Sequence, residues 1–506
     1  MTLTLAAVFT DGMVLQREMP IPIWGSAPTG AEVTVTVAGA TAKGRADDAG
    51  HWMVSLPPMC AGGPWTLTVC SNGEELRHEP VYCGEVWLAG GQSNMELPLK
   101  DARNGRKEVQ NSANPYLHFY QPAKVTTSEE AERLEHSPNA PAWKTVAPET
   151  AGDLSAVAYF AARTLSEHLN SIHIGIIVCC WGGTYAHCWI GRDELARFPE
   201  GQRRLAEYEA KIGQKSDEIF AEEQENYQKQ VDAWNAKLAA HKPDDENQVN
   251  WLILHKECGL YPWPPPAGRT SFQRPGNLYD SMLSRVVPYA LRGFWYYQGE
   301  QDEEWPEDYY ALLTSLIRRW RQDWKDPEKP FLLLQLPMFI SREDAQAGDP
   351  MRWPVLRKAQ AEAARTVPNV EMAVLADCGE LDNIHPTDKR TPGTRLGLLA
   401  LESVYHLPVV GKPPVCVKAW REGEAALLQF EHTGGGLILR GRGFLLAGEN
   451  GGFLTAYGQV VSPDTVRVTA FGVEKPTAVR YAWHSCGPAG LYGGTGLAAA
   501  PLERTL

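Results

Sequence analysis

The sequence lacks the excess of basic residues and the long apolar runs that mark two large classes of protein. Its 506 residues contain 48 Lys and Arg against 61 Asp and Glu, which gives a formal net charge of −13. Nucleic-acid binding needs a concentrated face of Lys and Arg to contact phosphates. No apolar run reaches the roughly 18 residues of a membrane span. We therefore expect neither a nucleic-acid partner nor a membrane-spanning segment.

Paired cysteine spacings and dense metal-ligand motifs are also missing. None of the ten cysteines has CxxC spacing, and Cys179, Cys180 and Cys378 sit in or beside strand-like apolar runs, where a reduced thiol packs as a small hydrophobic group. No motif such as H-E-x-x-H occurs, so we expect neither a metal nor another cofactor. The start of the chain has no basic leading segment and reaches Asp11 before a signal-length apolar stretch. These features favour a cytoplasmic location, or a secreted or periplasmic one if a signal peptide has been removed.

The two ends of the chain have the pattern of β-sheet modules. Within residues 1–82, VTVTVAG at 33–39 alternates with period two, and Gly, Pro and Asp clusters separate further short strands, which predicts a β-sandwich-like module. Residues 411–506 again contain short β segments and form a second, C-terminal β module in this interpretation. An alternative is that the two modules pack into one domain.

The middle of the chain, residues 83–410, has a different pattern of predicted secondary structure. Short apolar strands at 85–90, 172–180, 293–297, 331–336 and 370–376 alternate with helical patterns near 155–169, 307–324, 352–366 and 393–406. Strands without alternation, each followed by a helix, indicate a parallel sheet covered on both faces. Residues from 193 to about 245 are strongly helical and charged, and we interpret them as an inserted helical hairpin.

The strongest chemical signal is CGEVWLAGGQSNMELPL at 83–99, a buried strand that ends in a Gly-Gly turn and presents Ser93. The carboxyl ends of parallel strands are where open α/β sheets place their sites. The motif is not G-x-S-x-G, because Met95 stands where the second glycine would be. A Gly-x-Ser turn alone is common, so Ser93 is a candidate nucleophile only together with a base.

A second strand-end loop supplies that base. In DCGELDNIHPTDK at 377–389, Asp382 and His385 have D-x-x-H spacing, which lets a turn direct a carboxylate at the imidazole. Asp377, at the end of the preceding strand, is the rival for this role. Ser93 and His385 together predict nucleophilic catalysis.

Two further strand-end motifs could stabilise an oxyanion. WGGT at 181–184 and YQGEQD at 297–302 each follow a predicted strand. The backbone N–H groups of Ser93 and Gly183 and the side-chain amide of Gln298 would form a three-donor oxyanion hole, in which one donor is worth on the order of 3 kcal/mol.

These motifs resemble the sialate O-acetylesterase family, a branch of the SGNH hydrolases related to acetylxylan esterases. The likeness extends over nearly the whole chain and includes MVLQR at 13–17, GQSNM at 91–95, WGGT, GNLYDSML at 276–283, QGE and IHPTDK at 384–389. It implies a flavodoxin-like three-layer α/β/α catalytic domain with flanking sandwich or jelly-roll β modules, and a Ser-His mechanism without metal. One departure is His187, where relatives commonly have a glutamate, and this change bears on substrate contacts.

The resemblance also implies an O-acetylated mono- or oligosaccharide as substrate. We expect substrate contacts from Gln92, Asn277 and Glu300, which lie in the GQSNM, GNLYD and QGE motifs, and from Arg274, a candidate cation for the carboxylate of a sialate. The alternatives are an esterase for xylan, mannan or xyloglucan fragments, which should present more aromatic surface, and a non-catalytic carbohydrate-binding protein. The aromatic residues of YPWPPPAGRT at 261–270 either line a sugar site or only pack. The sequence does not specify the oligomeric state.

Overall fold

The computed structural model describes residues 2–240 and 257–506, and the chain divides into two units. The first unit comprises residues 1–295 and 315–329, and the second comprises residues 296–314 and 330–506. The division passes through strand β12 (Gly293–Tyr297) and helix α10 (Tyr309–Asp323). Residues 241–245 of the predicted insertion lie outside the described residues.

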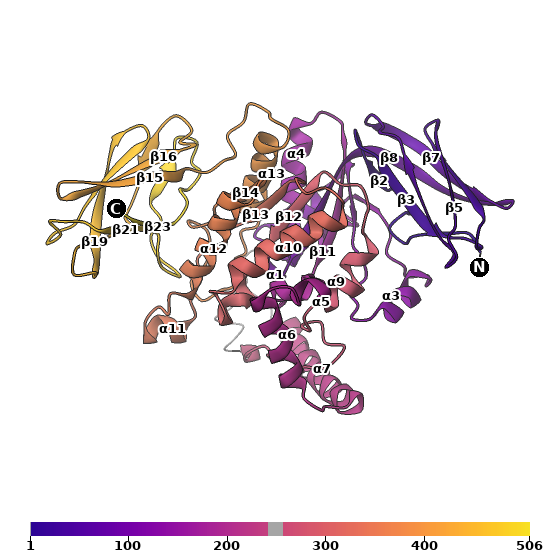
Figure 1. Cartoon of the computed structure of the whole chain (residues 1–506), viewed down its shortest axis with the longest axis horizontal. Coiled ribbons are helices and arrows are strands. Elements are labelled where there is room, and N and C mark those ends of the chain that lie inside the picture. Colours follow the sequence, from indigo (N-terminus) through magenta and orange to yellow (C-terminus); the bar gives the residue numbers. More distant parts are fainter. Residues whose placement is uncertain (1, 241–256) are drawn as a thin grey trace. The chain divides into compact units, whose positions relative to one another are not determined.

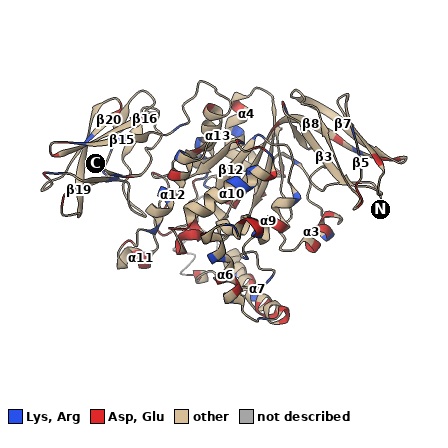
Figure 2. Ribbon diagram, in the orientation of Figure 1, with Lys and Arg blue, Asp and Glu red and all other residues tan. Residues whose placement is uncertain are grey.

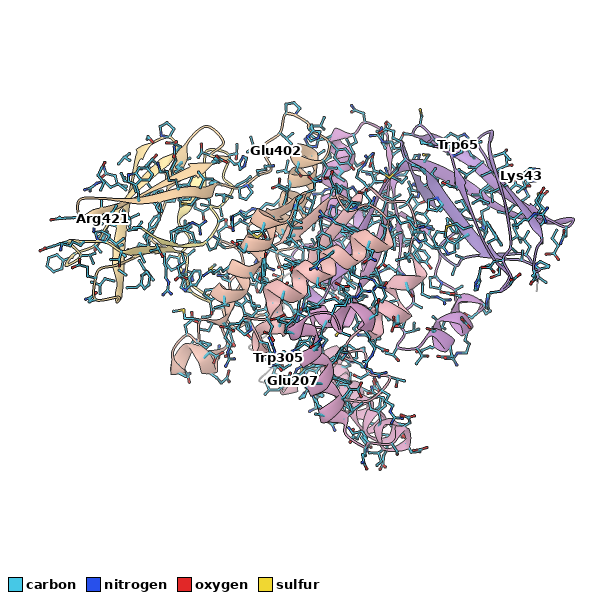
Figure 3. All side chains as sticks on the ribbon, viewed as in Figure 1. Lys43, Trp65, Glu207, Trp305, Glu402 and Arg421 are labelled. Carbon is cyan, nitrogen blue, oxygen red and sulfur yellow. The ribbon has the colours of Figure 1, made fainter. Side chains whose placement is uncertain are left out.

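Two β-sheets form the start of the first unit (Figure 1). One sheet contains β1 (Thr4–Leu5), β3 (Ile21–Ser26) and β6 (His51–Leu56), and a second set pairs in the order β5 (Ala40–Arg45), β4 (Glu32–Val37), β7 (Gly62–Ser71) and β8 (Glu74–Gly91). Alternate residues of β4 and β6 are buried, so the period-two pattern of the sequence is confirmed. Figure 3 labels Trp65 on β7 and Lys43 on β5, and Lys43 pairs with Glu32 at the surface.

Strand β8 carries the chain from these sheets into the α/β part of the unit. It is 18 residues long and begins at a hairpin turn formed by Asn72 and Gly73, whose φ angles of 49° and 85° suit a type I′ turn. Its first half pairs antiparallel with β7, and its second half pairs parallel with β11 (His173–Cys180). The predicted module boundary at 82/83 therefore lies inside one continuous strand.

The sheet of the first unit is mixed, whereas the sequence pattern predicted a parallel one. Strands β9 (Asn114–Tyr120), β11 and β8 are parallel, and β2 (Val14–Gln16) also runs parallel to β8. Its antiparallel pairs include β7 with β8, because a two-residue hairpin reverses the chain, and β10 (Lys144–Val146) with β9. The helical segments of this part are α1 (Ser93–Glu96), η1 (Leu99–Asp101), α2 (Gly105–Gln110), α3 (Ser128–Glu135), η2 (Ala151–Asp153), α4 (Ala156–His168), η3 (Ala186–Trp189), α5 (Arg192–Leu195), α9 (Asn277–Ser281) and η4 (Leu283–Arg285).

A buried ionic cluster fixes the middle of β8. Glu85 is fully buried and accepts hydrogen bonds from Arg292 at 2.8 Å and from Arg17 at 2.5 Å. Burial alone would raise the pKa of Glu85, but the two guanidinium groups outweigh it and lower the pKa. Both arginines are needed to balance the burial of this carboxylate, so the cluster ties β8 to the segments that carry Arg17 and Arg292.

The predicted charged insertion contains two helices, α6 (Pro199–Ile212) and α7 (Asp217–Ala240). Figure 2 shows acidic and basic residues along α7, and Glu207 of α6, labelled in Figure 3, accepts a hydrogen bond from Arg204 at 3.0 Å. These helices hold the segment 259–268 that follows them. Among the described residues, no helix is long and apolar enough to cross a membrane.

The second unit contains α/β elements and a C-terminal sheet. Strands β13 (Phe331–Leu334) and β14 (Val370–Ala373) are parallel, and the helical segments of the α/β part are η5 (Glu300–Glu304), α11 (Arg342–Ala347), α12 (Arg352–Thr366) and α13 (Arg390–Ser403). The C-terminal strands form a nearly closed seven-stranded sheet in the order β15 (Val415–Glu422), β16 (Ala425–Glu431), β20 (Thr465–Thr469), β19 (Phe453–Ser462), β18 (Phe444–Ala447), β21 (Ala478–Tyr481) and β23 (Leu502–Thr505), beside the pair β17 (Leu437–Leu439) and β22 (Leu491–Gly493).

Candidate active site

Ser93 stands where the sequence predicted it, at the end of β8. It is the first residue of the short helix α1 and is half-buried. Gly91, with φ 138°, makes the turn between strand and helix, a conformation that L side chains rarely adopt. The Trp181 N–H donates to the Gly91 carbonyl at 3.2 Å. The carboxyl ends of β8 and β11 therefore lie side by side.

The Gly182–Gly183 turn lies next to Ser93. A Cβ atom built on Gly182 would lie 3.2 Å from the Cβ of Ser93. The Gly182 N–H donates to the Glu96 carboxylate, and the Gly183 carbonyl accepts from Gln273 at 2.8 Å. Among the described residues, the Gly183 N–H has no acceptor. The turn is therefore fixed by Glu96 at Gly182 and by Gln273 at Gly183.

Aromatic side chains adjoin the same turn. A Cβ atom built on Gly183 would lie 2.4 Å from the indole ring of Trp263, so only glycine permits this approach. The rings of Trp181 and Phe272 stack with their centroids 5.1 Å apart. Lys124 lies over the Trp181 ring at 5.8 Å and pairs with Glu96. This side of the first unit therefore combines the serine, a glycine turn and exposed aromatic surface.

Gln298 belongs to the second unit, where it is fully buried in a hydrogen-bond network. Its Nε2 donates to the carboxylate of Asp302, and its Oε1 accepts from the Tyr309 hydroxyl at 3.2 Å and from that of Tyr296 at 3.4 Å. These partners fix which end of the amide is the donor. Asp302 is buried as well, so the network resists rotation of the Gln298 side chain.

His385 lies on the loop between β14 and α13 in the second unit. Its backbone N–H donates to the side chain of Asn383 at 3.0 Å. Burial, followed by the charge of Lys389, lowers the pKa of His385 from 6.5 to about 4. The imidazole is therefore neutral at pH 7, which is the form that accepts a proton.

Both carboxylates predicted as partners of His385 bind arginines. Asp382 accepts from the Arg342 side chain at 2.6 Å and from its backbone N–H at 3.2 Å. Asp377 accepts from two nitrogens of Arg395 at 2.6 and 2.8 Å. The role of Asp382 at the imidazole stays a prediction, and its observed contacts instead connect the His385 loop to α11.

The remaining predicted contact residues have different surroundings. Asn277 uses its amide to join two loops, donating to the carbonyls of Thr126 at 2.9 Å and Ser271 at 3.2 Å. Arg274 donates at 3.4 Å to Glu209, a carboxylate that it shares with Arg192. Gln92 is buried directly before Ser93 and Glu300 is buried at the start of η5.

His187 occupies the interior of the first unit. It is only 3% exposed and stacks on Tyr185 with the ring centroids 4.8 Å apart. Burial and the charge of Arg204 lower the pKa of His187 to about 3, so this residue is uncharged. His187 is therefore a neutral, buried side chain at the position where relatives commonly have a glutamate.

Comparison with known proteins finds similarity to carbohydrate acetylesterases. Residues 265–399 match the family described as carbohydrate esterase, sialic acid-specific acetylesterase, a stretch that contains the GNLYD, QGE and IHP motifs. The sialate O-acetylesterases of Mus musculus and Homo sapiens are 27% and 26% identical to the chain, over 79% of its length and 73% and 71% of theirs. A crystal structure of a carbohydrate acetylesterase from Xanthomonas citri is 29% identical with a TM-score of 0.77 and 99% coverage of both chains.

The predicted resemblance to the sialate O-acetylesterase family is confirmed. The protein is a carboxylic ester hydrolase. The non-catalytic alternative is therefore set aside.

Several polar residues that contact the predicted site residues or their neighbours were not identified from the sequence. Asp302 follows Gln298 by four positions within YQGEQD, so the motif itself contained the signal. Glu96 and Lys124 are separated by 28 positions, and no local pattern links them. The same holds for Gln273, which binds Gly183 from 90 positions away.

Proposed function

We propose that the protein is a serine O-acetylesterase acting on acetylated sugars, with Ser93 as nucleophile and His385 as general base. Residues 83–410 would form its catalytic domain, of the flavodoxin-like SGNH-hydrolase type, between two β modules. The observation that carries the proposal is the position of Ser93 beside the Gly182–Gly183 turn at the ends of two parallel strands.

The proposed reaction has two halves. His385 takes the proton of Ser93, and the serine oxygen attacks the acetyl carbonyl. The N–H groups of Ser93 and Gly183 and the Gln298 amide stabilise the oxyanion. The sugar hydroxyl then leaves with the proton from His385, water activated by the same histidine attacks the acetyl-enzyme, and acetate leaves as Ser93 regains its proton.

Two substrate classes compete within this function. The named activity of the curated relatives favours an O-acetylated sialate. An acetylated neutral glycan, such as a xylan, mannan or xyloglucan fragment, is favoured by a specific observation: Trp263 is exposed beside the Gly182–Gly183 turn, where the Lys124 cation already pairs with Glu96. A sialate carboxylate would instead call for an uncommitted cation.

The test is acetate release by the wild-type protein and by Ser93→Ala, with O-acetylated sialic acid, acetylated xylo-oligosaccharide and 4-nitrophenyl acetate as substrates. We expect Ser93→Ala to lose at least about a thousandfold in kcat, as for other serine nucleophiles. Ser284→Ala, at an exposed position of the same unit, is the matched control. Equal turnover by Ser93→Ala and the wild type would end the proposal.

A further inference from the structure

Trp263 is an exposed side chain beside the proposed acyl site, and the catalytic scheme leaves its role open. Its ring contacts Gly183, and the adjacent Gly182 contacts Ser93. Although its edge packs on the glycine turn, Trp263 remains 46% exposed. An indole ring that is both fixed at one edge and open to solvent can stack on a ligand at little entropic cost.

The helical insertion holds the segment that carries this ring. Four side chains from α6, α7 and their connection donate hydrogen bonds to backbone carbonyls of the segment 259–268. The bonds are Trp234 to Gly259 at 2.9 Å, Tyr227 to Pro262 at 3.2 Å, Lys215 to Ala267 at 2.9 Å and Tyr208 to Gly268 at 2.9 Å. Phe220 also packs against Gly268. The segment is therefore fixed along its length.

We propose that Trp263 is a sugar-stacking subsite, and that it binds the sugar next to the acetylated one in a neutral oligosaccharide. The face of an aromatic ring carries negative charge and attracts the C–H groups of a pyranose, whereas it repels a carboxylate. The Lys124 cation beside the glycine turn is held by Glu96, which also accepts from the Gly182 N–H. Both features favour a neutral glycan chain over an acidic sugar.

This inference rests on the esterase function proposed above and assigns the insertion a part in substrate choice. The helices α6 and α7 lie outside the strand-end motifs that carry the chemistry. By holding Trp263 against the Gly182–Gly183 turn, they extend the site beyond the acetyl group. The chain would then select acetylated oligosaccharides over acetylated monosaccharides.

The experiment compares kcat/KM for acetylated xylotetraose, for acetylated methyl xyloside and for 4-nitrophenyl acetate. In Trp263→Ala we expect the preference for the tetrasaccharide over the monosaccharide to fall about tenfold, the effect of losing one stacked ring. Trp263→Phe should keep part of this preference. Leu260→Ala, at a 79% exposed position of the same segment, is the control and should keep all of it.

Two results would overturn the inference. One is an unchanged preference in Trp263→Ala, and the other is an equal loss on all three substrates, which would assign Trp263 to bracing the glycine turn. Failure of the esterase proposal would give a different result. The wild-type protein and Ser93→Ala would then release acetate from 4-nitrophenyl acetate at the same rate.

Discussion

Gly182 faces Ser93 so closely that a Cβ atom on the glycine would lie 3.2 Å from the Cβ of the serine and 3.3 Å from the Glu96 carboxylate. The two residues are 89 positions apart, and they meet because β8 and β11 pair in parallel up to Gly91 and Cys180. The contact connects the proposed nucleophile to the turn that carries the Gly183 amide.

Gly182→Ala should lower kcat/KM by about tenfold or more, because a displacement of an ångström or less at reacting atoms can cost up to a hundredfold. Gly182 does not need a positive φ, so the effect would come from crowding of Ser93 rather than from backbone strain. The measurement is hydrolysis of 4-nitrophenyl acetate. Gly452→Ala, which has no heavy atom within 4 Å, is the control, and equal activity of the two variants would contradict the prediction.

Asp302→Leu should reduce kcat by about a hundredfold, the effect of losing one oxyanion donor. Asp302 accepts from Gln298 Nε2, so without it the amide is no longer held. Asp302→Asn keeps an acceptor oxygen and should retain more activity. Thermal unfolding of each variant checks that the second unit still folds.

A double-mutant cycle separates positioning from other roles of Asp302. If it acts through Gln298, then Asp302→Leu added to Gln298→Ala should cost little more than Gln298→Ala alone. Additive losses would show that Asp302 does not act through that amide.

Lys389→Met should move the acid limb of the pH profile of kcat/KM to higher pH. Burial and the Lys389 charge lower the pKa of His385 to about 4, so the proposed base stays neutral down to about that pH. Lys389 is itself buried, with Glu300, Glu380 and Asp388 as the nearest opposing charges. Removing its charge should raise the pKa of His385. An acid limb at the same pH in wild type and variant would contradict the effect of the Lys389 charge on that pKa.

The lowered pKa of His385 also makes the free energy of unfolding depend on pH. Because the folded-state pKa of His385 lies below that of the unfolded chain, the unfolded state binds the proton first as the pH falls from about 6.5 to about 4. Stability contributed by the neutral histidine is therefore present above pH 6.5 and lost through this window. His385→Gln should lose less stability between about pH 7 and about pH 5 than the wild type in urea titrations.

Asp382→Ala and Arg342→Ala should lower kcat to a similar and modest extent, by less than about tenfold. The two residues bind each other, so either change frees the loop that bears His385. A carboxylate that orients the imidazole would behave differently, because its loss costs about 10⁴ in kcat while Arg342→Ala would cost little. Steady-state kinetics of the two variants distinguish these roles.

Local patterns in the sequence determined a large part of this protein. The alternation at 33–39 predicted β4, the runs without alternation predicted β11, β12 and β14, and strand-end motifs indicated Ser93, Gln298 and His385 as candidate site residues. These features follow from short-range rules of side-chain periodicity and turn chemistry. The Asn72–Gly73 hairpin, which makes part of the sheet antiparallel, is equally local but was not recognised as a turn in the sequence.

Only the tertiary structure decided which of these residues have contact partners and which residues those partners are. Trp263 and Gly183 are 80 positions apart, and Arg342 and Asp382 are 40 apart. Nothing in either stretch of sequence specifies the other, because such contacts arise when burial of apolar faces brings distant segments together. The sequence therefore identified the chemistry of single residues, whereas packing determined that Asp382 binds an arginine and that an indole ring lies against the glycine turn.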